Sequence, residues 1–364
     1  MERRSKLYVK SIELDQFRNV EHLTLSLDPG INILYGQNAQ GKTNILEAVY
    51  LAGTTRSHRG AKDKDMIRLG MEESHIRMEM VRRDNDYRID MHLRRSRKKG
   101  AAIDGVPVRK ASELFGIASM VFFSPEDLNI IKNGPAERRR FLDSVISGVD
   151  RIYLSDLTQY HRCLQQRGKL LREANFHEGR LPELDVWDEQ LAVYGMRIIK
   201  KRRSFLRELE PEAAVIHREL TGQKEALRLI YEPNTDEMLF RDRQFAARGA
   251  DLKQKITSVG PHRDDFAILA NNMDLRTFGS QGQQRTAALT LKLSEISIIE
   301  KEISDQPVLL LDDVLSELDS DRQKLLLGCI RRTQTLITCT GLDEFVQNCF
   351  EADKTFHIVQ GGLA

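Results

Sequence analysis

The feature that most constrains this chain is a glycine-rich turn that follows a short apolar run. The run Ile31–Tyr35 predicts a β-strand, the turn Gly36–Gly41 follows it, and an apolar-faced helix is expected from about Lys42. The pattern Gly-x4-Gly-Lys-Thr is typical of a loop that binds phosphate. Its glycines let backbone N–H groups surround the anion, and the helix start adds a positive dipole end. The turn therefore predicts an α/β fold with an anion site at the end of a strand.

The residues of this loop have different expected roles. Lys42 is placed to contact the β- and γ-phosphates of a nucleotide, and the Thr43 hydroxyl is a candidate Mg²⁺ ligand. The alternative is a strand-to-helix turn that carries two glycines by chance, and the flanking strand and helix favour the functional interpretation. The candidate nucleotide-binding residues are Gly36, Gln37, Asn38, Ala39, Gln40, Gly41, Lys42 and Thr43.

A second motif lies more than 260 residues further along the chain. The continuous apolar run Val308–Leu311 is typical of a central parallel strand, and it ends in two acids, Asp312 and Asp313. Ligands of open α/β sheets bind at the carboxyl ends of the strands. Asp312 is therefore a candidate Mg²⁺ ligand, directly or through water. Asp313 is a candidate catalytic residue that orients or deprotonates the attacking water, and Lys42 is the other candidate catalytic residue. A helix N-cap would explain one acid, but two adjacent carboxylates repel each other and indicate a cation.

A third motif, Ser280–Gln284, precedes another apolar-faced helix. Taken alone, Ser280 would be an ordinary N-cap. Together with the two motifs above and with Ser316–Asp319, it resembles the signature motif and D-loop of ABC-type ATPases. That resemblance implies a head-to-tail dimer enclosing two ATP molecules, in which Ser280, Gly282 and Gln283 contact the nucleotide held by the other subunit.

Further stretches, spread over the whole chain in one order, resemble the RecF family of bacterial recombination mediators, within the SMC class of DNA-acting ATPases. They are Phe17–Asn19, Gly36–Thr43, Arg56–Arg59, Pro125–Leu128, Gly134-Pro135, Arg138–Asp143, Trp187-Asp188, Gly260–Asp265, Ser280–Gln284 and Leu311–Asp319. The resemblance implies a slow, DNA-stimulated ATPase used as a switch in DNA repair, replication, recombination and the SOS response. An ATP-driven dimer would bind duplex DNA near single-strand gaps and, with RecO and RecR, help to load RecA before hydrolysis releases the complex.

The expected architecture follows from the same resemblance and from the patterning. An α/β ABC-type head is expected from both chain ends, residues 1–125 and 255–364, with an inserted α-helical arm over residues 126–254. Apolar residues follow a helical period through most of this arm, and Pro211 is expected to end its second long helix. The arm is much shorter than the coiled coil of SMC proteins, which separates the chain from them.

Two features depart from the general ABC pattern. The second acid is Asp313, where transporters and SMC proteins usually place Glu, so a shorter reach to water predicts slow hydrolysis. Thr338 and Thr340 stand where many ABC ATPases place a switch histidine. The sequence therefore does not decide which of these two residues senses the γ-phosphate. No Q-loop glutamine is assigned, and Glu126 or Asp127 is the candidate for its place.

The expectation of DNA binding rests on local charge. The chain carries 56 Lys and Arg against 54 Asp and Glu, so a nucleic-acid surface must be local. Residues 88–110 have a net charge of +6, and the candidate DNA contacts are the turn residues Arg94, Arg95, Arg97, Lys98 and Lys99. Arg138–Arg140 and Lys200–Arg203 are further basic clusters, which neighbouring acids would also satisfy. His262 and Asp264 would suit a metal, but a structural or nucleotide-adjacent turn is favoured.

Composition excludes several classes. No apolar run reaches 18 residues, so no membrane span is expected, and the basic start lacks the apolar stretch of a signal peptide. The four cysteines lack zinc-ligand spacing and are interpreted as reduced thiols of a cytoplasmic protein. The alternatives are an ATP-powered nuclease, an ABC transporter subunit, and an SMC-like DNA-maintenance ATPase of a different pathway. About 25 residues follow Thr338, too few for the nuclease region. A transporter subunit would lack the helical insertion and the basic turn.

Overall fold

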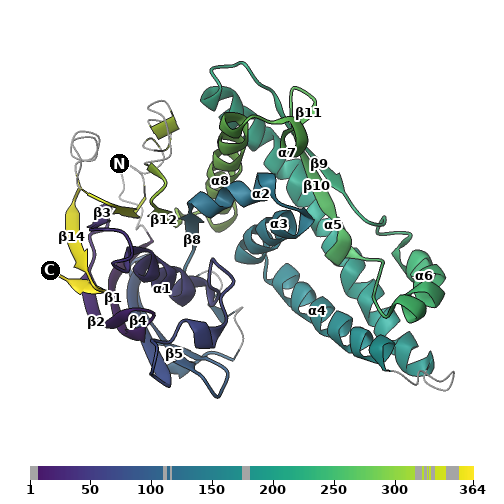
Figure 1. Ribbon diagram of the computed structural model, residues 1–364, viewed down its shortest axis with the longest axis horizontal. Coiled ribbons are helices and arrows are strands. Elements are labelled where there is room, and N and C mark those ends of the chain that lie inside the picture. Colours follow the sequence, from purple (N-terminus) through teal and green to yellow (C-terminus); the bar gives the residue numbers. More distant parts are fainter. Residues whose placement is uncertain are drawn as a thin grey trace. The chain divides into compact units, whose positions relative to one another are not determined.

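The computed structural model describes residues 7–109, 113–114, 117–173, 181–315, 322–323, 326, 328, 333–341 and 352–364. The chain forms two compact units, one of residues 1–127 and 295–364 and the other of residues 128–294 (Figure 1). Among the described helices, none is long and apolar enough to cross a membrane. Cys163 and Cys339 are free thiols, whereas Cys329 and Cys349 lie outside the described residues.

The described part of the first unit contains two six-stranded sheets. The antiparallel sheet has the spatial order β2 (Val20–Ser26), β1 (Tyr8–Phe17), β4 (Glu73–Arg82), β5 (Asn85–Arg94), β6 (Gly100–Ile103) and β7 (Val106–Pro107). The second, mainly parallel sheet has the order β15 (Gly362–Leu363), β14 (Lys354–Val359), β3 (Ile31–Tyr35), β13 (Thr335–Cys339), β12 (Val308–Asp312) and β8 (Met120–Phe123). In Figure 1 the yellow strand β14 lies beside the purple strand β3, so both chain ends build this sheet.

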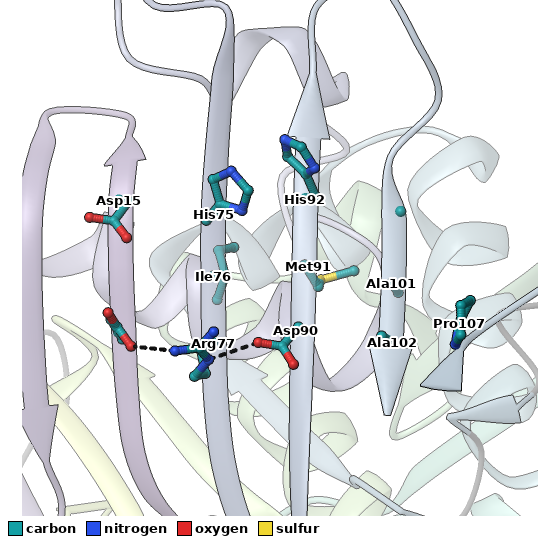
Figure 2. Close-up of a pocket in the computed structure, with 12 residues that line it drawn as sticks. Asp15, His75, Ile76, Arg77, Asp90, Met91, His92, Ala101, Ala102 and Pro107 are labelled. Carbon is teal, nitrogen blue, oxygen red and sulfur yellow. Dashed lines mark hydrogen bonds and ion pairs between the residues drawn. The ribbon is translucent and has the colours of Figure 1, made fainter. Parts of the chain in front are cut away.

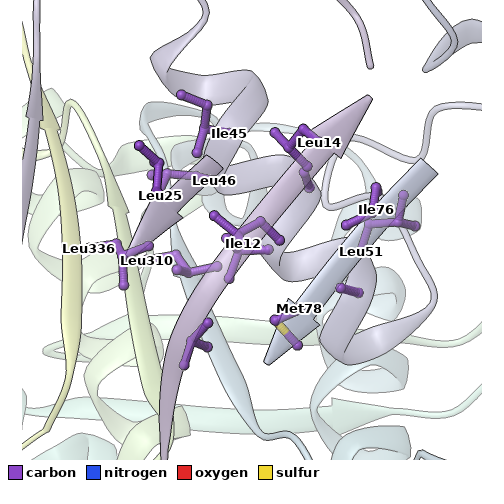
Figure 3. Packing of buried hydrophobic residues seen from close by; sticks show 14 of the residues in the cluster. Ile12, Leu14, Leu25, Ile45, Leu46, Leu51, Ile76, Met78, Leu310 and Leu336 are labelled. Atoms are coloured by element: carbon purple, nitrogen blue, oxygen red, sulfur yellow. The ribbon is translucent and has the colours of Figure 1, made fainter. Parts of the chain in front are cut away.

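One apolar core joins the two sheets of this unit. The strand β4 alternates exposed and buried residues, as expected for a sheet with one face in a core and one in water. All five residues of β12 are buried, as expected for a central parallel strand. Helix α1 (Lys42–Thr54) packs against strands of both sheets. Figure 3 shows this layer, with Ile45, Leu46 and Leu51 of α1 among Ile12, Leu14, Leu25, Ile76, Met78, Leu310 and Leu336.

The second unit is mostly helical. Its helices are α2 (Asn129–Lys132), α3 (Pro135–Val149), α4 (Arg151–Arg172), α5 (Leu181–Leu220), α6 (Phe240–Gln254) and α7 (Leu275–Phe278), and α8 (Gln281–Ile303) begins in it. A three-stranded antiparallel sheet joins them, in the order β11 (Met273–Asp274), β10 (Asp265–Ala270) and β9 (Leu227–Glu232). Asp150 separates α3 from α4, because its carboxylate accepts the N–H groups of Ile152 and Tyr153 and starts the second helix.

The boundaries of the two units differ from the expected ones at one end. The first boundary lies at 127/128, beside the expected 125/126, but residues 255–294 belong to the second unit and not to the head. The reason is strand pairing: β10 lies within that segment and hydrogen-bonds to β9 along its full length. The arm is therefore not purely helical.

The expected break at Pro211 is also wrong, because α5 continues through it to Leu220. A proline removes one helical hydrogen bond, but packing on both sides can hold the helix together. Leu209 before the proline, and Ala213 and His217 after it, are all fully buried.

Candidate nucleotide-binding site

The glycine-rich turn has the predicted context, since β3 precedes it and α1 begins at Lys42. Both glycines of the motif are required by their surroundings. A Cβ atom on Gly36 would lie 2.3 Å from the carbonyl oxygen of Ile358 on β14, and one on Gly41 would lie 2.7 Å from Oδ1 of Asn19. Gly41 also has a φ of +103°, which favours glycine. The loop is therefore shaped by two distant segments of the chain.

Lys42 is folded back over this loop. Its Nζ donates hydrogen bonds to the carbonyl oxygens of Gly36, at 2.6 Å, and Gln37, at 2.7 Å. Burial lowers the pKa of the ammonium from its ordinary value, and the carboxylates of Asp313 and Asp312 oppose that shift. The side chain is thus held at the loop, with donors that an incoming anion can recruit.

The acid pair lies at the carboxyl end of β12, next to the loop. Parallel pairing with β13 places Asp312 beside Thr338. Oδ1 of Asp312 accepts a hydrogen bond from the Thr43 hydroxyl at 2.7 Å and another from the Thr338 hydroxyl at 2.8 Å. The backbone N–H of Asp313 donates to the same Thr338 hydroxyl at 3.0 Å. The two predicted Mg²⁺ ligands are therefore in direct contact, and Thr338 connects them to Asp313.

The two threonines considered for γ-phosphate sensing have different surroundings. Thr338 is buried and bonded to both acids, whereas Thr340 is exposed. In the candidate Q-loop segment, Asp127 accepts the N–H of Ser124 at 2.8 Å and closes a local turn, while Glu126 is more than half exposed. The assignment of a sensor and of a Q-loop residue stays a prediction.

Sequence reasoning missed the residues that hold the loop from outside. Asn19 lies against Gly41, and its Oδ1 accepts a hydrogen bond from the Asn44 side chain at 2.8 Å. On another side, the N–H groups of Gln360 and Gly361 donate to the side chain and the backbone carbonyl of Gln40, at 2.6 and 2.8 Å. Asn19 belongs to a stretch singled out by family resemblance, but no local pattern points to the C-terminal turn.

An ion pair near the start of the chain anchors α1. Arg18 makes two hydrogen bonds of 3.0 Å to the fully buried carboxylate of Glu47, and Ser57 donates a third at 2.6 Å. Burial alone would raise the pKa of Glu47, but the hydrogen bonds from Arg18 and Ser57 outweigh it and hold the pKa below its usual value. Arg18 and Ser57, which lie in two of the stretches that carry the family resemblance, therefore meet at one carboxylate.

The third motif lies in the second unit, at the start of α8. The Ser280 hydroxyl accepts the N–H of Gln283 at 3.2 Å, and the Gln283 side chain accepts the N–H of Ser280 at 2.9 Å, which is a capping box. Gln283 also donates to Glu225 at 2.9 Å. Ser280 and Gly282 are exposed. The N-cap interpretation is thus confirmed, and it leaves this helix start open to a ligand or partner. The D-loop candidate, Ser316–Asp319, lies outside the described residues.

Comparison with known proteins identifies the family. The model of the RecF/RecN/SMC N terminal domain matches residues 8–361. The chain is 57% identical over 355 residues to the DNA replication and repair protein RecF of Agathobacter rectalis, covering 98% of both chains. It is 51% identical to that of Lachnoclostridium phytofermentans, covering 98% of this chain and 99% of the relative. This chain belongs to the RecF family.

Solved structures agree with that membership. A structure of the recombination mediator protein RecF with ATPrS, described as part of the RecFOR pathway, has a TM-score of 0.91 at 38% identity over 99% of this chain and 98% of that one. A RecF-ATP structure has a TM-score of 0.90 at 39% identity, over 98% and 96%. An SMC head domain from Pyrococcus furiosus, at 16% identity and a TM-score of 0.55, shares the fold. The protein is an ABC-type ATPase with the expected mixed α/β content and helical insertion.

In this RecF-family chain, the basic turn predicted to contact DNA connects β5 to β6. Three of its five cations are already engaged within the first unit. Arg94 contacts His92 at 2.6 Å, Arg95 donates to the Met71 carbonyl at 2.6 Å, and Lys99 pairs with Asp63 at 2.6 Å. The other two, Arg97 and Lys98, are exposed and make no hydrogen bond or ion pair among the described residues. They are the turn residues most available to a phosphate.

The other two basic clusters are largely structural. In the first, Arg138 is buried and makes a bidentate pair with Asp265 at 2.6 and 2.8 Å. In the second, Arg202 is buried and bonds to Asp143 at 2.7 Å, and Arg203 pairs with Asp236 and Glu237. These side chains pair with acids of the second unit, so their charge is largely neutralised within the protein.

The histidine of the Gly260–Asp265 stretch is likewise part of a packed turn. His262 contacts the Tyr160 hydroxyl through Nδ1 at 2.7 Å and the Thr257 carbonyl through Nε2 at 2.9 Å. Burial lowers the pKa of His262 to about 4. Both ring nitrogens are thus occupied, and Asp264 accepts hydrogen bonds from Arg202, Tyr231 and Asn234. The structural interpretation holds, and the metal interpretation of this pair does not.

Proposed function

We propose that this protein binds ATP with Mg²⁺ at Gly36–Thr43 and hydrolyses it slowly, and that ATP controls a dimer that holds duplex DNA. The observation that carries the proposal is the contact of Thr43 with Asp312 at the carboxyl end of β12, where Thr338 also joins Asp313. Support comes from RecF relatives whose structures are described with ATP and ATPrS.

The donor set at this contact fits Mg²⁺. A hydroxyl and a carboxylate are hard oxygen ligands, which Mg²⁺ prefers. Two neighbouring ligands of an octahedral Mg²⁺ lie about 3 Å apart, and the Thr43 and Asp312 oxygens are separated by 2.7 Å. When bound, the ion would neutralise phosphate charge and polarise the terminal phosphate. The proposed ligands are therefore Thr43 and Asp312.

The remaining residues have roles that follow from their positions. Lys42 would exchange its two carbonyl contacts for the β- and γ-phosphates, because ionic oxygens are stronger acceptors than backbone carbonyls. Asp313 would orient or deprotonate the attacking water. Its side chain is one methylene shorter than the usual Glu, which supports slow turnover and use as a timed switch.

The dimer and its partners are proposed on the family resemblance. Ser280, Gly282 and Gln283 would cover the nucleotide held by a second copy, in a head-to-tail arrangement. The closed dimer would hold duplex DNA near single-strand gaps in the cytoplasm, and with RecR and RecO it would help to load RecA. Arg97 and Lys98 are the proposed phosphate contacts of the Arg94–Lys99 turn. Arg94, Arg95 and Lys99 would add further contacts if they left their present partners.

Molar mass by light scattering tests the switch, with and without ATP and duplex DNA. We expect the wild-type mass to double with ATP. Ser280→Arg should stay monomeric while still binding ATP, because Ser280 is exposed and is not part of the glycine-rich loop that holds the nucleotide. Thr277→Arg is the matched control, since Thr277 in α7 is also exposed. An ATP-dependent mass in Ser280→Arg equal to that of wild type would refute the proposed dimer.

A further inference from the structure

A row of titratable side chains crosses the exposed face of the antiparallel sheet. The strand register places His22 opposite Asp15, Asp15 opposite His75, and His75 opposite His92, on β2, β1, β4 and β5. Directly opposed residues of neighbouring strands point to the same face. Figure 2 shows Asp15, His75 and His92 side by side on their three strands. Glu73 lies two residues before His75 on β4 and therefore shares this face.

Three members of this cluster bring ligand atoms close together. Oε2 of Glu73 lies 2.6 Å from Nε2 of His92 and 4.0 Å from Nε2 of His75. The two imidazole rings are stacked, with centroids 3.9 Å apart, and one ligand atom from each of the three residues lies within 4.8 Å of the others. Two ligands of a tetrahedral Zn²⁺ are about 3.3 Å apart. The observed separations bracket that value, and small side-chain rotations would reach it.

Space for a further ligand exists beside the cluster. The residues of β6 opposite His92 and Asp90 are Gly100 and Ala102, so that strand has no large side chain on this face. The result is a hollow of about 400 Å³, which His75 and His92 line (Figure 2). A cation held at the edge of the hollow would keep one position open to water or to a small ligand.

We propose that Glu73, His75 and His92 form a binding site for a divalent transition-metal ion of the Zn²⁺ type, with its fourth position facing this hollow. Two imidazoles and one carboxylate are a ligand set that Zn²⁺ accepts with three protein ligands and one open position. The neighbouring cluster of Glu13, Asp15 and His22 is less suitable. It offers a single imidazole and two carboxylates, and Arg77 pairs with its Glu13 at 3.3 Å.

Arg94 competes with the metal. Its Nη2 lies 2.6 Å from Nδ1 of His92 and its Nε lies 3.4 Å from Nε2. Because a guanidinium only donates, Nδ1 accepts in the much shorter contact. The ring proton is then on Nε2, facing Glu73. For Nε2 to bind a cation, that proton moves to Nδ1 and Arg94 leaves, while the imidazole stays neutral. Removing the guanidinium should therefore tighten metal binding, which is the opposite of what loss of a structural contact would do.

The test is calorimetric titration of the untagged, full-length protein with ZnCl₂ at neutral pH, with Co²⁺ absorption as a second readout. We expect one equivalent in wild type. The double variant His75→Ala, His92→Ala should lose it. Arg94→Gln should bind about tenfold more tightly, because the hydrogen bond from the Arg94 guanidinium to His92 no longer has to be broken. All of these side chains are at least partly exposed, so the variants should fold, which thermal melts would verify.

Two control variants separate this site from the others. His22→Ala removes the histidine of the neighbouring cluster, and Asp312→Asn alters the candidate Mg²⁺ site, so both should keep the Zn²⁺ equivalent. The proposal is overturned if the double variant still binds that equivalent, if Asp312→Asn loses it, or if Arg94→Gln binds Zn²⁺ more weakly than wild type.

Discussion

Replacing Thr338 with valine should separate the chemistry of the acid pair from its packing. Valine has nearly the same shape as threonine but lacks the hydroxyl. In wild type that hydroxyl donates to Asp312 at 2.8 Å and accepts the N–H of Asp313 at 3.0 Å, in a position that is almost fully buried. The substitution therefore leaves the core volume unchanged and removes two hydrogen bonds that join β12 to β13.

The size of the effect can be worked out from these two contacts. Each hydrogen bond contributes about 1 kcal/mol net, and a buried group that loses its partner costs about 1–3 kcal/mol. Thr338→Val should thus lower the free energy of unfolding by about 2–4 kcal/mol. If misplaced acids remove half of that free energy from the stabilisation of the transition state, ATP turnover falls about tenfold. This uses roughly 1.4 kcal/mol per factor of ten in rate.

The assays are urea unfolding and steady-state ATP hydrolysis with duplex DNA. Thr338→Ser keeps the hydroxyl and should retain most of the turnover, although it loses a methyl group. Thr340→Val alters the exposed threonine two residues later and should change neither quantity. Wild-type turnover and stability in Thr338→Val would refute a positioning role for Thr338. A loss of turnover confined to Thr340→Val would move the sensor role to Thr340.

Three further outcomes are expected. The folded-state pKa of His262, about 4, lies below its ordinary value of 6.5, so the unfolded chain binds the proton first and stability falls as pH drops from about 6.5 to 4. That loss is about 3 kcal/mol, and a pH-independent urea midpoint over this range would contradict it. Lys42→Met should weaken ATP binding tenfold or more, because a charge-assisted contact of roughly 1.5–3 kcal/mol is lost; unchanged affinity in a nucleotide titration would move the site elsewhere. Replacing Arg97 and Lys98 with alanine should flatten the log–log salt dependence of DNA binding by about 3.6 for a dimer, with ATP binding unchanged, and an unaltered slope would place the DNA contacts outside this pair.

Local patterns accounted for the nucleotide motifs. The strand, the glycine turn and the helix start at Lys42 depend on residues a few positions apart, and so does the apolar run that ends in Asp312. Helical periodicity likewise predicted a helical arm, where the structure has α3, α4 and α5. Such signals are short-ranged, because spacing along the sequence sets the hydrogen bonds within a turn. It also sets which side chains of one helix or strand share a face.

Long-range pairing accounted for the rest. Thr43 and Asp312 are 269 residues apart in sequence and touch only because β3 and β12 both pair with β13. For basic clusters such as Arg138–Arg140 the sequence left DNA contact and pairing with neighbouring acids open, and the fold places carboxylates against them. The sequence also does not indicate that His75 and His92 are neighbours, because they lie on two different strands. Which side chains meet across a sheet depends on strand order and register, and those follow from the packing of the whole core.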